Sequence, residues 1–564
     1  MVQQPSDDSC WSAEDPKKAH SDEAVTIDAY FGRIGEFGRY QRSHYAVVAG
    51  AWVACAWITF SMVFVNARPA WLAVAEGTTT TPCDDPDAWT IADTAQSVGA
   101  EWRLVCADGY RRASLDSLYF LGFLIGASAL GAASDRYGRR KACAVSAGIA
   151  AGGSLASAFA PSFGAFAVLR FLAGIGVGGL GSDCYVLASE FIGPSWQSRT
   201  GNAQAAIFAV GGTLLAPVAL CMPGWRSLAL VSALPAAAYV PVFLLGVAES
   251  PRWLLAQGRA DEAARVLLRV GVVNGATAQG TPPPKLATSG GGGGGGGAGA
   301  QTSGRDEAAG ELRCGAVGRL CSTAALRRRT GVMVLCWFAA SFSYYGLSLN
   351  AGNLEGSLHA NFALSVAVEI PADLLAGWLC DRVGRKITLA AAFGAAGALC
   401  LSCAVLPASL IAGAAMLGKF AISAAFAIVF VYTAELFPTP LRNVGMGVSS
   451  SAARIGGMAA PSVILLADLL GARAPNVVFG SAGAVACCGV LLLPETKGRP
   501  MPETVADCDD ARGRSSRRRN SMSTRKLRVA PLSESDGDAP VDEGAPVVWS
   551  PASESTDGHT HGVK

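Results

Sequence analysis

The chain contains long apolar runs that fall into two sets of six. The first set lies at 46–65, 115–133, 142–160, 163–188, 203–221 and 228–247, and the second at 332–349, 362–379, 387–406, 410–433, 445–467 and 476–493. An α-helix needs roughly 20 mostly apolar residues to cross a bilayer. Hydrophobic residues make up 51% of the chain and charged residues 16%, whereas ordinary globular proteins carry roughly 25% charged residues. We therefore expect an all-α membrane protein with twelve transmembrane helices in two six-helix halves.

Polar segments divide the chain around these runs. We predict an N-terminal segment at 1–44, a first half at 45–249 with a loop at 67–112, a linker at 250–330, a second half at 331–494 and a tail at 495–564. The linker carries the glycine run Gly290–Gly297, and the tail is polar. Such segments bury too little apolar surface to fold, so we expect both to be largely disordered. The tail sequence RRRNSMS, at 517–523, is a candidate site for a basophilic kinase.

Basic residues in the short loops predict the orientation. They concentrate between the second and third helices of each half and after the tenth helix, where Arg136, Arg382 and Arg442 lie. Because loops rich in lysine and arginine stay on the cytoplasmic side, we expect both termini and the linker to be cytoplasmic. The loop at 67–112 is then extracellular. Its two cysteines, Cys83 and Cys106, are candidates for a disulfide in an oxidising compartment.

One loop occurs twice, at matching positions in the two halves. GAASDRYGRRK at 131–141 and GWLCDRVGRK at 377–386 share the pattern G-x-x-x-D-R-x-G-R-[RK]. We expect its first glycine to allow close helix approach, its aspartate to meet a helix N-terminus and its second glycine to permit a tight turn. The candidate gating residues are Gly131, Asp135, Arg136, Gly138 and Arg139 in the first copy, and Gly377, Asp381, Arg382, Gly384 and Arg385 in the second.

Acidic residues at helix ends are the expected partners of these arginines. The candidates are Glu190, Glu249, Glu435 and Glu495, and Arg252 and Arg442 join the same gating group. A network of this kind closes the cytoplasmic side and opens when the two halves rock. The alternative is that the basic loops only anchor the helices, which two copies in matching positions disfavour.

Several motifs resemble those of the major facilitator superfamily. They are RFLAGIGVGG at 170–179, AESPRWLLAQGR at 248–259, GEFGRYQ at 35–41, EWRLVC at 101–106, YTAELFPTPLRNVGMGVSS at 432–450 and PETKGRPMPET at 494–504. Together they are similar to the organic cation, organic anion and carnitine transporter family, and GKFAISAAF at 418–426 is similar to its carnitine and zwitterion branch. The resemblance implies alternating-access transport of small organic ions across the plasma membrane, with the substrate between the halves.

Ionisable side chains within the apolar runs are candidate substrate ligands, because placing one at the bilayer centre costs roughly 2.5–3.5 kcal/mol. Glu369, Lys419 and Arg454 are the main ones. Arginine holds a carboxylate with two hydrogen bonds, and the glutamate suits an ammonium group. By resemblance, the aromatic residues Tyr185, Trp337 and Tyr344 match substrate-lining positions and suit a quaternary ammonium group. Two alternatives remain: the charges neutralise one another, together with Asp373, or the aromatics only pack helices.

Other functions are weighed against transport of organic ions. A sugar porter shares the segments PRWLL and PETKG, and a membrane sensor or scaffold could use the same fold. An enzyme is disfavoured, because no nucleophile with a base, phosphate-binding loop or metal-ligand spacing occurs. We therefore expect no metal or cofactor. The formal net charge of +2 disfavours a nucleic-acid partner. The coupling ion, sodium or proton, stays open, as do the substrate and the oligomeric state.

Overall fold

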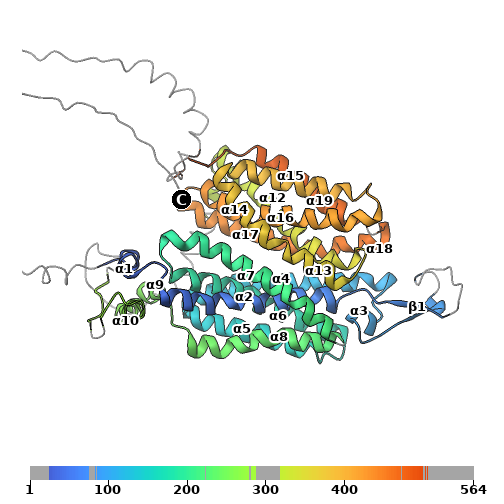
Figure 1. Cartoon of the computed structure of the whole chain (residues 1–564), viewed down its shortest axis with the longest axis horizontal. Coiled ribbons are helices and arrows are strands. Elements are labelled where there is room, and N and C mark those ends of the chain that lie inside the picture. The colour runs from blue at the N-terminus through green and yellow to red at the C-terminus, as the bar shows by residue number, and fades with distance from the viewer. Residues whose placement is uncertain are drawn as a thin grey trace, which may run out of the picture. The chain divides into compact units, whose positions relative to one another are not determined.

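The computed structural model describes residues 25–74, 83, 86–222, 224–278, 281–286, 315, 318–471, 473–498, 502, 505 and 508. Long helices of the first half are α2 (Arg39–Val65), α4 (Gly109–Tyr137), α5 (Arg139–Ser157), α6 (Phe163–Glu190), α7 (Gln197–Cys221) and α8 (Trp225–Pro241), which continues as the π-helix η4 (Val242–Gly246). Those of the second half are α12 (Ala324–Leu349), α13 (Leu358–Ala367) with α14 (Glu369–Arg382), α15 (Arg385–Ser402), α16 (Ala408–Leu436), α17 (Thr439–Ile464) and α19 (Ala474–Leu491). Figure 1 shows the two bundles, the first coloured blue to green and the second yellow to red.

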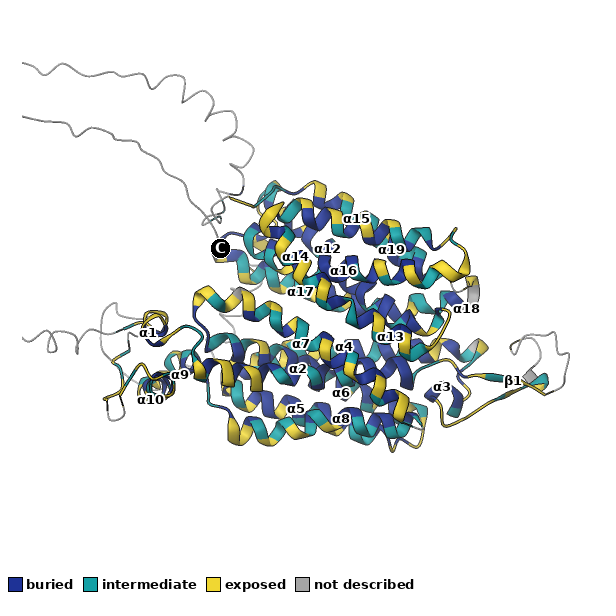
Figure 2. Ribbon diagram, in the orientation of Figure 1, coloured by how far each residue is buried: buried dark blue, intermediate teal, exposed yellow. Residues whose placement is uncertain are grey.

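The helices have the apolar surface of a membrane protein. In the described part of the chain, nine helices are long and apolar enough by themselves to cross a bilayer. The other three are α5 and α15, which begin with basic residues, and α17, which is rich in glycine and serine. Large apolar side chains such as Leu245 and Val405 lie more than four-fifths exposed, and Figure 2 shows exposed residues along the outward sides of the helices. Lipid accounts for such a surface, which water would not tolerate.

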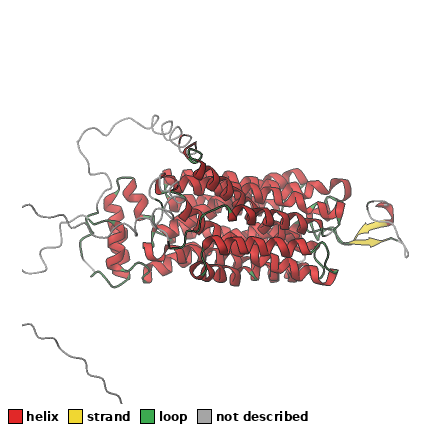
Figure 3. Cartoon of the chain, turned by 90° about the horizontal axis from the view of Figure 1, so that it is seen from above, coloured by secondary structure: helices red, strands yellow, loops and turns green. Residues whose placement is uncertain are grey.

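The two ends of the bundle differ. At one end, β1 (Trp71–Ala73) pairs antiparallel with β2 (Trp89–Ile91), with Leu72 opposite Thr90. A disulfide joins Cys83 to Cys106, the pairing expected from the sequence. We call this the hairpin end. The duplicated loops lie at the opposite end, the linker end, with α1 (Ile27–Ile34), α9 (Pro251–Ala256) and α10 (Ala260–Val273). Figure 1 labels these three helices at the end away from β1, and Figure 3 shows the two strands, in yellow, at the hairpin end.

Shorter elements complete the connections. Near the hairpin end, α3 (Val98–Glu101) holds the loop onto α8, because Glu101 accepts hydrogen bonds from the Trp225 and Arg226 side chains at 2.8 and 3.2 Å. The remaining short elements are η1 (Pro86–Ala88), η2 (Cys106–Asp108), η3 (Pro194–Trp196), η5 (Asn350–Asn353) and α18 (Leu466–Leu470).

The predicted linker is wrong at its beginning. Residues expected to be disordered from 250 onward form α9 and α10, because Leu254 and Leu267 are buried there. Asn274, just after α10, fixes this unit to the first half: its side chain donates to Gln41 Oε1 at 2.9 Å and accepts from the Tyr40 backbone at 2.9 Å. The glycine run lies outside the described residues. The halves also begin earlier than predicted, with α2 at Arg39 and α12 at Ala324.

The contacts that join the two halves gather toward the hairpin end. The Ser117 hydroxyl of α4 donates to the Met458 carbonyl of α17 at 2.9 Å. The ring of Phe362 on α13 lies 5.4 Å from that of Phe60 on α2. Nearer the middle of the helices, Phe120 on α4 lies 4.7 Å from Tyr345 on α12. Among the described residues, no ion pair within 4 Å crosses between the halves at the linker end.

Candidate functional site

Two opposite charges meet in the interior of the second half. Lys419 Nζ on α16 lies 2.9 Å from Glu369 Oε1 on α14, and both side chains are at most 4% exposed. The Tyr344 hydroxyl on α12 donates to the other Glu369 oxygen at 2.7 Å. Lys419 Nζ also donates to the Ser348 hydroxyl at 2.8 Å and lies 3.1 Å from the centre of the Tyr344 ring. Every charged atom of the pair therefore has a partner from a neighbouring helix.

The local sequence explains why Glu369 sits at this position. The helix is interrupted at Val368, between α13 and α14, so that Glu369 is the first residue of α14. Pro371 follows two residues later, and a proline removes a backbone donor and crowds the carbonyl four residues earlier, here that of Ala367. The interruption ends α13 and aims the Glu369 carboxylate toward α12 and α16.

Arg454 lies apart from this pair. Its guanidinium donates to the backbone carbonyl of Ser450 at 3.0 Å, to the Ser450 hydroxyl, and lies 5.7 Å from the centre of the Phe123 ring on α4 of the other half. No carboxylate of the described residues lies within 4 Å of it, although the side chain is largely buried. The alternative in which all four charges neutralise one another therefore holds only in part: Glu369 and Lys419 form a pair, and Arg454 is not included.

Asp373 is a second charge without a direct partner. It lies four residues after Glu369, on the same face of α14. Lys419 and Glu369 are near enough to act on it electrostatically, but it forms no hydrogen bond or ion pair within 4 Å with any described residue. Because Lys419 already compensates Glu369, Asp373 and Arg454 are left without a partner of opposite charge within 4 Å among the described residues.

The three predicted aromatic residues have different surroundings. Tyr344 belongs to the charged cluster. Trp337 is 1% exposed; its indole N–H donates to the Thr433 hydroxyl at 2.8 Å, and its ring lies 4.3 Å from that of Phe430, so it packs α12 against α16. Tyr185 on α6 is 46% exposed. Trp337 therefore packs two helices together, which is the alternative to a substrate-lining role, whereas Tyr185 is accessible.

At the linker end, the first duplicated loop forms a cluster within its own half. Arg139, at the start of α5, pairs with Asp135 at 2.5 Å and with Glu190 at the end of α6 at 3.4 Å. Glu249 Oε1 accepts the backbone N–H groups of Arg139 and Arg140 at 2.9 and 3.1 Å. The arginine therefore connects the ends of α4 and α6, and Glu249 caps the N-terminus of α5.

The second loop repeats this arrangement. Arg385 Nε donates to Glu435 Oε1 at 3.1 Å, and Arg385 Nη2 lies 3.8 Å from Asp381 Oδ1. Glu495 accepts the backbone N–H groups of Arg385 and Lys386 at 2.9 and 3.1 Å, which caps α15. The predicted pairing is confirmed for Arg139 with Glu190 and for Arg385 with Glu435, whereas Glu249 and Glu495 contact backbone N–H groups. However, neither cluster bridges the two halves in this structure.

Two expectations for the duplicated loop are wrong. The carboxylates at the helix N-termini are those of Glu249 and Glu495, whereas Asp135 and Asp381 are mostly exposed. Gly131 and Gly377 have open space where a Cβ would lie, so they do not serve close helix approach. That role belongs to Gly126, where a Cβ would meet the backbone of Ile175 on α6.

The second glycines of the loops do have the predicted role. Gly138 and Gly384 have φ angles of +109° and +122°, which side chains rarely adopt. A Cβ at either position would also collide with the capping carboxylate of Glu249 or Glu495. Each glycine therefore makes room for the acid that caps the next helix.

The remaining predicted gating residues have mixed surroundings. Arg252 forms an ion pair with Asp28 of α1 at 2.5 Å and donates to the Glu190 carbonyl at 3.2 Å, so it ties the N-terminal helix to the first cluster. Arg136 and Arg382 lie over the rings of Tyr137 and Trp378. Arg442, near the start of α17, has no hydrogen-bond partner for its buried Nε and Nη2 atoms among the described residues.

The stability of the folded protein should depend on pH through Glu495, at the linker end. Partial burial acts to raise the pKa of Glu495, but the backbone N–H groups of Lys497, Arg385, Thr496 and Lys386 outweigh it and lower this pKa below its usual value. A carboxyl group whose pKa is lower in the folded state than in the unfolded state stabilises the fold at any pH above its unfolded pKa. This stabilisation is lost as the pH falls through the pKa of the folded state. We expect Glu495→Gln to lower the melting temperature in detergent at pH 7, and the difference from wild type to shrink below about pH 4. An equal difference at both pH values would contradict this assignment.

Comparisons with known proteins agree with this architecture. Residues 110–506 match the family model described as sugar (and other) transporter. The chain is 32% identical to organic cation/carnitine transporter 4 of Arabidopsis thaliana, over 90% of this chain and 95% of that protein. It is 37% identical to solute carrier family 22 member 15 of Xenopus tropicalis, over 73% of this chain and 75% of that one.

Among solved structures, the inward-open xylose transporter of E. coli aligns with a TM-score of 0.56 at 16% identity, over 82% of this chain and 98% of that one. This likeness concerns the fold. The sequence matches, the twelve helices and the two duplicated loops agree on one assignment. The chain is a multi-pass membrane transporter of the major facilitator superfamily and belongs to its organic cation and carnitine transporter family.

Proposed function

We propose that the protein carries small zwitterions, such as carnitine-like betaines, through a site formed mainly by the second half. The main support for this proposal is the position of Arg454, whose guanidinium is largely buried and has no carboxylate partner among the described residues. A buried charge is costly unless it is paired, and a substrate carboxylate can supply the pair. The names of the relatives support organic cations and carnitine as the substrate class and disfavour the sugar-porter alternative.

The ammonium end of the substrate needs an acid. Glu369 was the predicted ligand, but both of its oxygens are held by Tyr344 and Lys419. Asp373, one turn further along α14, carries the uncompensated negative charge. We therefore assign the ammonium group to Asp373 and the carboxylate to Arg454. In this proposal the pair of Glu369 and Lys419 positions Tyr344, and the exposed Tyr185 lines the path.

Replacing Asp373 with asparagine tests this assignment. We expect about a tenfold loss in apparent affinity for a labelled betaine, about 1.4 kcal/mol, because the ammonium group loses its counter-charge. Uptake of a carboxylate that lacks an ammonium group should be unaffected or improved. Asp373→Glu, which keeps the charge, serves as the matched control. Equal losses for both substrates would indicate a general structural defect and contradict the assignment.

Transport in this proposal follows alternating access. The contacts between the halves gather toward the hairpin end, and the acid–arginine clusters at the linker end stay within each half. We assign the linker end, with both termini, to the cytoplasm and the hairpin end to the exterior of the plasma membrane, where its disulfide is stable. Cysteine-accessibility mapping tests this orientation: substitutions at Arg136 and Arg382 should both label from the cytoplasmic side only.

A substrate panel separates the remaining alternatives. Uptake into vesicles of a betaine, an organic cation, an organic anion and a sugar, each under imposed sodium and proton gradients, identifies substrate and coupling ion together. A sensor or scaffold would bind a substrate without accumulating it.

The predicted kinase site at 517–523 lies outside the described residues. We propose phosphorylation of Ser521 or Ser523 there, which mass spectrometry of the full chain would detect.

A further inference from the structure

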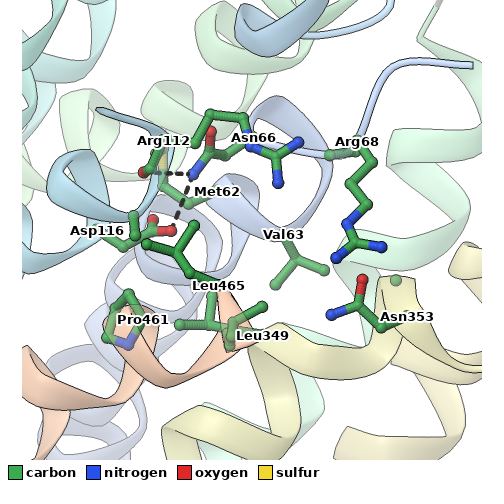
Figure 4. A pocket seen from close by; sticks show the side chains of 14 residues that line it. Met62, Val63, Asn66, Arg68, Arg112, Asp116, Leu349, Asn353, Pro461 and Leu465 are labelled. Atoms are coloured by element: carbon green, nitrogen blue, oxygen red, sulfur yellow. Dashed lines mark hydrogen bonds between the residues drawn. The ribbon is translucent and has the colours of Figure 1, made fainter. Parts of the chain in front are cut away.

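A small cavity lies between the two halves, toward the hairpin end. Its volume is about 60 Å³, room for a few water molecules. The first half contributes the end of α2 with the residues that follow it and the start of α4. The second half contributes the end of α12 with η5 and the end of α17. Figure 4 shows the side chains that line it. Polar groups come mainly from the first half, whereas the end of α17 and the residue after it contribute the apolar Pro461, Ile464 and Leu465.

Asp116 on α4 is the acid of this cavity. The side chain is 7% exposed, and its Oδ2 accepts one hydrogen bond, from Asn66 Nδ2 at 2.9 Å, which Figure 4 marks. No ion pair within 4 Å joins Asp116 to a cation in the part of the chain that the structure describes, although Arg112 and Arg170 are near enough to act on it electrostatically. The substrate site proposed above does not use this acid.

The exposure of Asp116 to water depends on the position of the two halves relative to each other. α17 belongs to the second half, and the hydrogen bond from Ser117 to the Met458 carbonyl holds it against α4 next to Asp116. When the halves separate at the hairpin end, Pro461, Ile464 and Leu465 move away with α17, and water reaches the carboxyl group. When the halves close, as in this structure, apolar side chains displace most of that water and leave only the small cavity. Such a replacement disfavours the carboxylate relative to the neutral acid.

We propose that Asp116 is a proton-binding site of the gate at the hairpin end, which takes up a proton from that side as the gate closes and releases it to the same side as it opens. Acidification on that side then favours the closed gate. In this proposal the acid exchanges its proton with the hairpin side alone, so the proton is not carried across the membrane. The site regulates access and is distinct from the coupling ion. This inference rests on the transporter fold and not on the identity of the substrate.

Other charged and titratable groups surround the site. Arg68 follows α2, Arg112 lies one turn before Asp116 on α4, and Arg170 on α6 donates to the Ile58 carbonyl at 2.9 Å. Tyr119 shares a hydrogen bond with Thr59 at 2.7 Å. His359 on α13 stacks on Phe64 at 5.0 Å and is the titratable side chain that most needs a control, since free histidine titrates near neutral pH.

The test follows gate opening directly and does not require uptake. A cysteine placed at Ile464, with the same chain without this substitution as background, is labelled in proteoliposomes by a membrane-impermeant thiol reagent from the hairpin side. The fraction of open gate is taken from the labelling rate, corrected for the pH dependence of the reagent on a free thiol. We expect the open fraction to fall on acidification, by at most about tenfold per pH unit because one proton is involved. Acidifying the opposite side should have no effect.

Three variants decide the outcome. Asp116→Asn should remove the pH response and keep the gate in its low-pH distribution. Asn66→Ala removes the one hydrogen bond that the carboxylate accepts from the described residues, so it should move the midpoint of the response to higher pH. This result is informative even if Asp116→Asn does not fold. His359→Gln should keep the response. A response that persists in Asp116→Asn, that disappears in His359→Gln or that has the same midpoint in Asn66→Ala would overturn the proposal. Failure of betaine uptake alone would count only against the proposed substrate.

Discussion

Replacing Arg454 with alanine should lower the apparent affinity for a betaine about 30- to 100-fold, about 2–3 kcal/mol, the usual cost of truncating one partner of a buried charge pair. The guanidinium donates to Ser450, and no carboxylate of the described residues lies within 4 Å of it. An organic cation without a carboxylate should be carried as well as before, or better, because an uncompensated positive charge has been removed.

Arg454→Lys is the matched control for this result. Lysine keeps the charge but loses the two-pronged geometry that fits a carboxylate, so its affinity should fall between those of wild type and alanine. Labelled uptake over a range of concentrations measures all three proteins. Unchanged betaine uptake in Arg454→Ala, with normal expression, would exclude the assigned role.

Replacing Lys419 with methionine should destabilise the protein by about 3–5 kcal/mol, because it leaves the buried Glu369 carboxylate without its counter-charge. The double replacement Glu369→Gln with Lys419→Met removes both charges and should recover most of this loss. Thermal unfolding of the purified proteins in detergent measures the difference. Lys141→Met, at an exposed lysine of α5, is the control for losing a lysine. A single variant as stable as wild type would show that the pair is dispensable for folding.

Much of the local structure was predictable because it depends on short stretches of chain. The length of each apolar run indicates a helix, and the prediction for 445–467 differs from α17 mainly at its polar start. The φ angle of Gly138 follows from the tight turn between two helices. The disulfide between Cys83 and Cys106 was expected from two cysteines in one polar loop. The folding of α9 and α10 was missed because a glycine run and prolines nearby dominated the composition of the linker.

The partners of the charged residues were less predictable. Asp135 and Glu249 are both acids close to the linker end, and only their placement shows that Glu249 caps α5. Trp337 and Tyr344 share a face of α12, yet Trp337 packs against α16 and only Tyr344 reaches the charge pair. These outcomes depend on the distances between helices that lie far apart in the chain. The periodicity of side chains along one helix does not give those distances.

The sequence by itself determined the twelve membrane helices, their division into two related halves and the family, since hydrophobic length and duplicated motifs are properties of the chain read along its length. Only the tertiary structure decided which buried charges neutralise each other. Glu369 is compensated because helix packing brings Lys419 within 2.9 Å of it, whereas Arg454 has no carboxylate among the described residues. In a medium of low dielectric constant, the presence or absence of a nearby counter-charge separates a structural ion pair from a charge that we propose binds the substrate.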